Sequence, residues 1–204
     1  MSSTTEAHFL PAACIGPNAV TRLAETITAM EGAPATARVF GACNLETYLL
    51  APPLGMIDEH EVADLHRELH KVFGDARARS IGGAAGRKTA EYLLDHRIPR
   101  VAQFFMRHLA SRRSSARMLT AAIAKHAWTF AGSGKFTVSG TRRLVFSISG
   151  CPLCRSVAST LPYCNFYACT FEVLFQTLVD PNAQVDEIDC QATGSSACRF
   201  SIEW

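Results

Sequence analysis

The sequence predicts an α+β protein in which a helical N-terminal portion packs on a small antiparallel sheet. Apolar residues recur at the spacing of amphipathic helices through the first two thirds of the chain. A Gly-Ser-Gly sequence at residues 132–134 then marks a sharp change in composition, and β-rich segments follow it. We therefore divide the 204 residues into a helical N-terminal region, residues 1–127, and a C-terminal domain, residues 128–204, which we expect to form one compact unit.

The N-terminal region is expected to contain six helices. Proline and glycine mark the breaks between them, because proline removes an amide donor and glycine favours helix ends. Gly32 and Pro34 end the first helix, residues 51–55 interrupt the chain before the third, and Pro99 follows the fourth. The expected helices cover residues 19–30, 37–50, 58–73, 76–96, 101–109 and 115–126.

The C-terminal domain is expected to fold as a hairpin, a helix and a second hairpin. Residues 135–138 and 144–148 are β-rich and are joined by a Ser-Gly-Thr loop, which is typical of a hairpin. Residues 164–179 have the length and the apolar pattern of a helix. Residues 185–190 and 198–204 alternate like strands, with a Gly-Ser turn between them.

Composition excludes several classes of function. The formal net charge of +2 gives no strong attraction to nucleic acid. No apolar run approaches the roughly 20 residues that a membrane span needs. The N-terminus lacks the basic and apolar segments of a secretory signal, so we expect a cytoplasmic protein. In that reducing compartment the eight cysteines are more often metal ligands or redox groups than disulfides.

Residues 81–86, Ile-Gly-Gly-Ala-Ala-Gly, have the wrong spacing and context for a nucleotide site. A dinucleotide fingerprint follows a strand and opens a helix, whereas these glycines lie inside a helical pattern and follow charged residues. Close packing of the helix against a neighbour explains them better. The sequence shows no other nicotinamide or flavin motif.

Three cysteines and a glutamate near the C-terminus, Cys164, Glu187, Cys190 and Cys198, are the strongest candidates for a metal site. Zinc accepts both thiolate and carboxylate ligands in a tetrahedral arrangement. Buried cysteines also act as small apolar residues, and the spacing alone leaves both interpretations open.

Cys151 and Cys154 form a second cysteine motif, Cys-Pro-Leu-Cys. The motif follows a strand, as in redox enzymes, but other thioredoxin-like signals are missing. A separate metal site would need two further ligands, and only Cys169 is left in this half of the chain. We therefore interpret this pair as structural or incidental.

The C-terminal third resembles the 4-vinyl reductase domain. The resemblance rests on Cys164 before a helix, on E-x-x-C-x-A-x-G at residues 187–194, and on C-R-F at residues 198–200. The whole chain also resembles the BchJ-like family of bacteriochlorophyll biosynthesis proteins. That wider resemblance covers Gly-Pro-Asn-Ala at 16–19, PPLGMIDE at 52–59, TAEYLL at 89–94 with RIP at 97–99, and HAWTFAGSG at 126–134.

The resemblance implies a structural zinc ion on Cys164, Glu187, Cys190 and Cys198, because the equivalent residues bind zinc in phenol-sensing activators with this domain. It also implies a tetrapyrrole ligand of the Mg-porphyrin or protochlorophyllide type. Histidine is a common axial ligand of such pigments and aromatic residues provide flat apolar walls. The candidate pocket residues are His126, Trp128, Phe130, Phe104 and His108, and a basic cluster that could receive carboxylates comprises Arg107, Arg112, Arg113 and Arg117.

Three functions are consistent with this sequence. The first is a carrier or accessory factor of bacteriochlorophyll synthesis that binds a tetrapyrrole and assists vinyl reduction or a neighbouring step. The second is a 4-vinyl (8-vinyl) reductase acting on divinyl protochlorophyllide, for which the hydride source is missing. The third is a small-molecule sensor or interaction module. Other enzymes of the pathway and a second copy of the chain are the expected protein partners.

Overall fold

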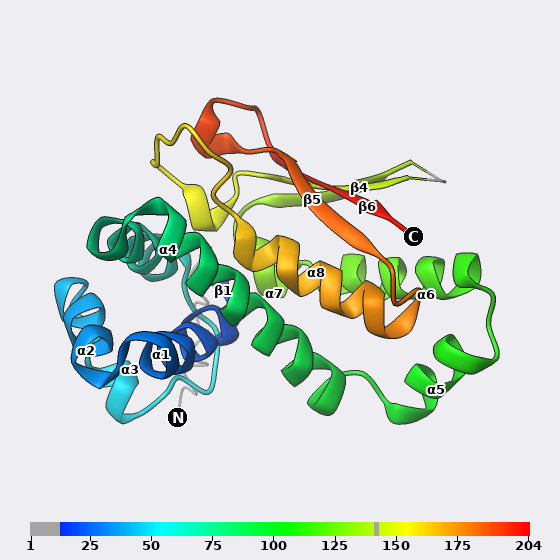
Figure 1. Ribbon diagram of the computed structural model, residues 1–204, viewed down its shortest axis with the longest axis horizontal. Helices are drawn as coiled ribbons and strands as arrows, with labels where there is room; N and C mark the ends of the chain where they lie inside the picture. Colours follow the sequence, from blue (N-terminus) through cyan, green and yellow to red (C-terminus); the bar gives the residue numbers. More distant parts are fainter. Residues whose placement is uncertain (1–12, 141–142) are drawn as a thin grey trace, which may run out of the picture.

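The computed structural model describes residues 13–140 and 143–204 and has the predicted α+β architecture (Figure 1). A two-residue ladder joins β1 (Cys14–Ile15) to β2 (Ile57–Asp58). The helices before the main sheet are α1 (Asn18–Glu31), α2 (Ala33–Ala42), α3 (Thr47–Leu50), α4 (Glu59–His96), α5 (Arg100–His108), α6 (Arg112–Lys125) and α7 (Trp128–Ala131).

The main sheet is antiparallel and has the order β3-β4-β6-β5. Both predicted hairpins are confirmed, because β3 pairs with β4 and β5 pairs with β6. The pairing of β4 with β6 joins the two hairpins into one sheet. The elements of this part are β3 (Lys135–Ser139), β4 (Leu144–Ser149), η1 (Pro152–Cys154), α8 (Asn165–Leu178), β5 (Gln184–Asp189), η2 (Gln191–Thr193) and β6 (Cys198–Glu203).

The structure changes two of the expected helices. The helix expected over residues 37–50 is divided into α2 and α3, because Asn44 adopts a left-handed backbone conformation with φ of 56°. The helices expected over residues 58–73 and 76–96 form one long element, α4, with a kink at Gly74, where φ is 72° and ψ is 163°. The Asp58 side chain accepts a hydrogen bond from the His60 amide, so the predicted cap at Asp58 is confirmed.

Helix α8 lies between the sheet and α4 (Figure 1). Its aromatic side chains fill the space below the sheet, since Phe171 packs edge to face against Phe146 of β4 and Phe200 of β6. On the opposite side, a Cβ atom at Gly86 of α4 would overlap the backbone carbonyl of Phe166. The glycines at residues 82–86 therefore let α4 approach α8 closely, as the sequence predicted.

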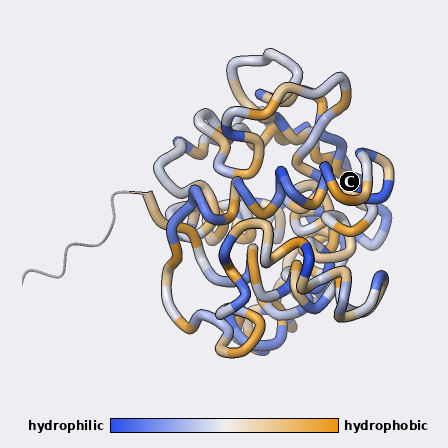
Figure 2. Tube along the Cα trace, turned by 90° about the vertical axis from the view of Figure 1, so that its left-hand side faces the viewer, coloured by the Kyte–Doolittle hydropathy of each residue, from blue (hydrophilic) through white to orange (hydrophobic). Residues whose placement is uncertain are grey.

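The helical layer is closed by α1 and α2, which pack on α4. Hydrophobic and hydrophilic residues alternate along these helices, and the hydrophobic ones form the core (Figure 2). Val20, Leu23 and Ile27 of α1 are buried at the helical spacing expected from the sequence. Among the described residues, no helix is long and apolar enough to cross a membrane.

A buried ionic contact joins the helical part to the start of the sheet. Glu59, the first residue of α4, is fully buried and accepts hydrogen bonds from the backbone and the hydroxyl of Ser133 at 2.7 and 2.6 Å. Its carboxylate also lies 2.5 Å from the Arg155 guanidinium, which donates to the Ser133 hydroxyl as well. This contact crosses the boundary that we proposed between residues 127 and 128.

Candidate metal centre and ligand-binding face

Five buried cysteines and one glutamate meet at the end of the sheet above the start of α8. Cys151 and Cys154 flank η1, Cys164 precedes α8, Cys190 follows β5 and Cys198 begins β6. These positions bring five thiols from four connections of the fold into one cluster, which we call the cysteine cluster and in which we include Glu187.

The four residues predicted to bind metal lie together in this cluster. Their candidate ligand atoms all lie within 4.8 Å of one another. The Cys198 sulfur is 3.6 Å from that of Cys164 and 3.9 Å from that of Cys190. Tetrahedral zinc with bonds of about 2.3 Å places its sulfur ligands roughly 3.8 Å apart. The group is therefore spaced to hold a metal ion.

Glu187 has one oxygen oriented by the fold and one left over. Its Oε2 accepts a hydrogen bond from the Cys164 amide at 2.7 Å. Its Oε1 is buried and has no hydrogen-bond partner among the described residues. A buried carboxylate oxygen without a partner is costly, and coordination of a cation would satisfy it.

The protonation of the cluster also fits a cation. Burial, followed by the neighbouring Cys190, raises the pKa of Glu187 to about 9, and burial raises the pKa of the Cys164 thiol. A hydrogen bond with Cys151 lowers the pKa of Cys154. Metal ligands bind in their deprotonated form, so a bound ion would hold these groups ionised and replace the solvation that they lose on burial.

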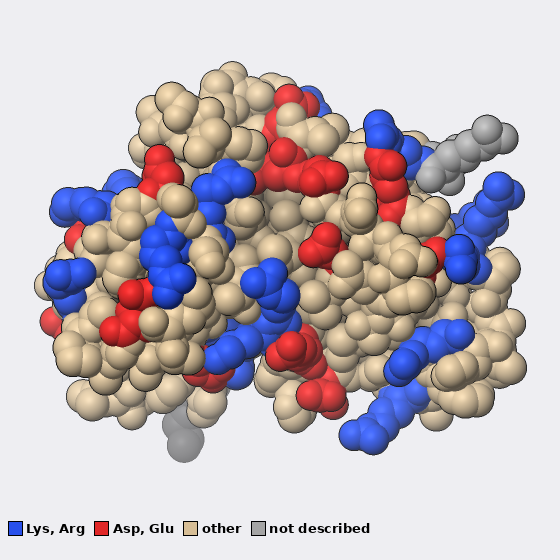
Figure 3. All heavy atoms as spheres, in the orientation of Figure 1, with Lys and Arg blue, Asp and Glu red and all other residues tan. Residues whose placement is uncertain are grey.

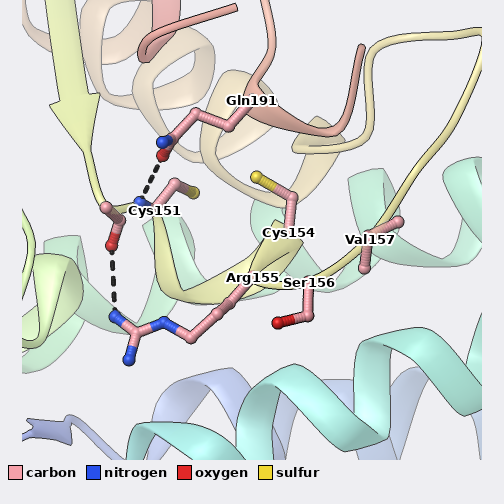
Figure 4. Close-up of a pocket in the computed structure, with 7 residues that line it drawn as sticks. Cys151, Cys154, Arg155, Ser156, Val157 and Gln191 are labelled. Carbon is pink, nitrogen blue, oxygen red and sulfur yellow. Dashed lines mark hydrogen bonds between the residues drawn. The ribbon is translucent and has the colours of Figure 1, made fainter. Parts of the chain in front are cut away.

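The structure places Cys151 and Cys154 inside the same cluster. Their sulfurs lie 3.5 Å from Cys164 and 3.3 Å from Cys198, respectively, and they point toward one another in Figure 4. The expectation that only Cys169 is left to complete a second set is wrong, because ligands can be shared between two sets. The signal lies in the sheet, where Ile148 of β4 pairs with Cys198 and so brings the residues after β4 beside it.

The five residues expected to line a tetrapyrrole pocket do not form one enclosed site. Phe130 packs edge to face against Phe136 and Phe171 in the core. Trp128 is 60% exposed, and His126 beside it at the end of α6 is also exposed. The other two residues lie on the surface of α5 with ring centroids 4.9 Å apart, and they are Phe104 and His108.

An exposed apolar surface surrounds Phe104 and His108. On α5 only Met106 is buried, so the remaining apolar side chains of this helix face solvent. The sequence pattern identified these residues as helical but did not indicate that they are uncovered. The surface, which we call the α5–α6 face, has large apolar side chains that are 42–81% exposed, namely Val101, Phe104, Phe105, Leu109 and Met118.

Positive charge borders the α5–α6 face. Lys and Arg side chains gather over the α5 end of the molecule at the lower right of Figure 3. Arg112 of the predicted basic cluster pairs with the buried carboxylate of Asp180 at 2.5 Å, which ties α6 to the end of α8. Arg107, Arg113 and Arg117 are exposed, and none of the ion pairs between described residues involves them. Three of the four arginines are thus available to an anionic ligand.

Two pockets lie beside the cysteine cluster and away from the expected tetrapyrrole residues. One has a volume of about 220 Å³ and is lined by Cys151, Cys154 and Gln191, among others (Figure 4). The other, of about 320 Å³, is bordered by Arg67 and by His70, whose ring stacks on Tyr163 at 3.9 Å. Both are small openings next to the metal centre.

The fold is that of the H-NOX proteins. An H-NOX protein from K. algicida superposes with a TM-score of 0.60 at 11% sequence identity, covering 93% of this chain and 96% of that one. A second solved structure, from a study of heme distortion in the H-NOX family, gives a TM-score of 0.59 at 12% identity over 93% and 95% of the two chains. At these identities the likeness concerns the fold.

Sequence comparison gives the family. The model of the 4-vinyl reductase domain family matches residues 144–204. The bacteriochlorophyll synthase 23 kDa chain of Cereibacter sphaeroides is 40% identical over 188 residues, which cover 92% of this chain and 89% of the relative. The same protein of Rhodobacter capsulatus is 37% identical over 92% of this chain and 86% of the relative. The chain belongs to the family of the bacteriochlorophyll synthase 23 kDa chain, which confirms the BchJ-like resemblance.

Proposed function

We propose that this protein binds a tetrapyrrole intermediate of bacteriochlorophyll synthesis, of the Mg-porphyrin or protochlorophyllide type, on the α5–α6 face. In this role it acts as a carrier or accessory factor for vinyl reduction or a neighbouring step. The observation that carries the proposal is the α5–α6 face itself, an exposed aromatic and aliphatic surface with a histidine and free arginines. Relatives named for bacteriochlorophyll synthesis and structural neighbours studied for their heme support it.

The chemistry of the α5–α6 face suits such a ligand. A tetrapyrrole presents a flat apolar macrocycle, and the exposed ring of Phe104 offers a surface on which it can stack. His108 lies 4.9 Å from that ring and is placed to ligate a central Mg²⁺ from one side. Arg107 and Arg113 can pair with the carboxylates of the pigment through bidentate hydrogen bonds.

The face has the properties of an interaction surface even without the pigment. Monomeric proteins rarely expose contiguous apolar patches of this kind unless they bind something. A carrier must leave its ligand accessible to the enzyme that receives it, and an open face achieves this better than an enclosed cavity. His126 and Trp128, exposed at the end of α6, are the second place for pigment contact.

For the metal centre, we propose a structural zinc ion on Cys164, Glu187, Cys190 and Cys198. Four protein ligands leave no open position for water, whereas catalytic zinc keeps one. The ion would fix the connection between β5 and β6 to the start of α8. Its role is therefore to stabilise the C-terminal domain, residues 128–204, and the chemistry of the pathway takes place elsewhere.

A vinyl reductase acting on divinyl protochlorophyllide is the alternative, favoured by the match of residues 144–204 to the 4-vinyl reductase domain family. That activity needs a hydride donor. A sensor or interaction module, including a homodimer formed through the α5–α6 face, is the third candidate.

One titration separates these functions. Purified full-length protein is mixed with divinyl protochlorophyllide, with and without NADPH, and the absorbance spectrum and the products are recorded. A spectral shift without turnover is the expected result. Conversion to the monovinyl pigment with no other protein present would contradict the carrier function, and an unchanged pigment spectrum would contradict tetrapyrrole binding itself.

A further inference from the structure

The cysteine cluster contains more ligands than one metal ion can use. Zinc in structural protein sites is four-coordinate. The cluster offers six donors, which are five thiols and the Glu187 carboxylate. An ion bound to the four residues proposed above would leave Cys151 and Cys154 buried against its thiolates at 3.5 and 3.3 Å.

The six donors divide evenly into two sets of four. Cys164 and Cys198 belong to both sets. Glu187 and Cys190 complete one set, and the Cys-Pro-Leu-Cys pair, Cys151 and Cys154, completes the other. Because a thiolate sulfur has several lone pairs, Cys164 and Cys198 can each bridge two ions. This is the composition of a two-metal site with two bridging thiolates and two terminal ligands on each ion.

We propose that Cys151, Cys154, Cys164 and Cys198 form a second metal position, so that the protein holds two ions bridged by the Cys164 and Cys198 sulfurs. The inference rests on the metal site proposed above and is independent of the tetrapyrrole. All four residues of the new set are buried, and their ligand atoms lie within 4.8 Å of one another. An all-thiolate set selects soft metals such as Zn²⁺.

The surrounding backbone holds the second set in place. The Cys151 amide donates to the Gln191 side-chain oxygen at 2.6 Å, and the Gln191 amide donates to the Cys198 sulfur at 3.4 Å. Gln191 thus ties the Cys-Pro-Leu-Cys segment to the connection between β5 and β6. Such outer contacts orient metal ligands and are typical of built metal sites.

An ion can reach the second position from outside. The pocket of about 220 Å³ ends on Cys151 and Cys154, which lie at its inner side in Figure 4. The set nearer Glu187 lies deeper, because Cys164, Cys190 and Cys198 have no exposed surface. The two ions are therefore expected to differ in accessibility, with the second released first to a chelator.

Metal stoichiometry tests the proposal directly. Full-length protein is purified under reducing conditions, loaded with Zn²⁺ and weighed by native mass spectrometry. We expect two ions in the wild type, one in Cys151→Ser/Cys154→Ser and one in Glu187→Gln/Cys190→Ser. Cys43→Ser, which changes a cysteine of the helical layer outside the cluster, serves as the matched control and should retain two.

A single ion in the wild type would overturn the second position. If that ion were lost only from Glu187→Gln/Cys190→Ser, the structural site proposed above would stand alone. If it were lost only from Cys151→Ser/Cys154→Ser, the ion would occupy the all-thiolate set, and both metal assignments would be wrong.

Spectroscopy of the wild type keeps the test valid if a variant fails to fold. With ¹¹³Cd²⁺ in place of Zn²⁺, NMR should give two resonances, one from a site with four sulfur ligands and one from a site with three sulfurs and one oxygen. Coupling between them through the shared sulfurs is expected. One resonance at full loading would contradict the two-metal site.

Discussion

Replacing Glu59 by alanine tests the buried contact that joins the helical part to the sheet. The carboxylate is fully buried and binds Ser133 through two hydrogen bonds and Arg155 through an ion pair at 2.5 Å. Removing one partner of a buried pair costs about 3–5 kcal/mol, because the remaining charge loses its compensation. The Arg155 side chain is 29% exposed and regains some water, so we expect about 3 kcal/mol.

Urea unfolding provides the measurement. The free energy of unfolding of Glu59→Ala should fall by about 3 kcal/mol relative to the wild type, with an unchanged dependence on urea concentration. Asp64→Ala is the matched control, because Asp64 pairs with Arg67 on the surface of the same helix and both side chains are about half exposed. Exposed pairs contribute about 0–1 kcal/mol.

A further variant assigns the loss to the ion pair. Arg155→Ala alone should destabilise the protein by less than Glu59→Ala, and the double variant should be more stable than the sum of the two losses predicts. Equal effects of Glu59→Ala and Asp64→Ala would refute the reasoning. Two separate unfolding transitions in the wild type would contradict the single compact unit that we propose for residues 1–127 and 128–204.

Two further predictions concern acid stability and helix packing. Burial lowers the pKa of His66 to about 3 from 6.5, so the unfolded chain binds the proton more readily, and stability is retained above about pH 6.5 and lost as the pH falls toward 3. His66→Leu should remove roughly 3 kcal/mol of the loss between pH 7 and pH 4 in urea titrations, and an unchanged slope would contradict the assignment. Gly86→Ala should cost about 1–3 kcal/mol of unfolding free energy, because its Cβ would overlap the Phe166 carbonyl, whereas Gly82→Ala, with ordinary contacts, should be neutral or stabilising by up to about 1 kcal/mol. Equal thermal stabilities of the two glycine variants would contradict the proposed close approach.

The layout of the fold followed from local patterns in the sequence. The helical spacing of Val20, Leu23 and Ile27 identified α1, and Gly74 was correctly taken as a break, since its backbone adopts a positive φ. The order of the strands could not be read in the same way. The pairing of β4 with β6 joins residues that are distant in the chain, and it depends on tertiary packing around α8.

The candidate sites show the same division. The spacing of Glu187 and Cys190 indicated a metal site, because the family motif is local in sequence. The recruitment of Cys151 and Cys154 depends on the register of β4 against β6, which no local pattern contains. Apolar periodicity likewise identifies the side of α5 that carries Phe104, but it does not tell whether another element covers that side.

Pigment affinity of a surface variant tests tetrapyrrole binding on the α5–α6 face most directly. Mg-protoporphyrin is titrated into the wild type, Phe104→Ala/His108→Ala and Leu54→Ala, a control that removes a fully exposed leucine outside this face. Burying a phenylalanine contributes about 1.5–3 kcal/mol, so the dissociation constant of the double variant should rise roughly 10- to 100-fold, with an unchanged circular dichroism spectrum. The control should bind like the wild type. Equal dissociation constants for all three proteins would contradict pigment binding at this face.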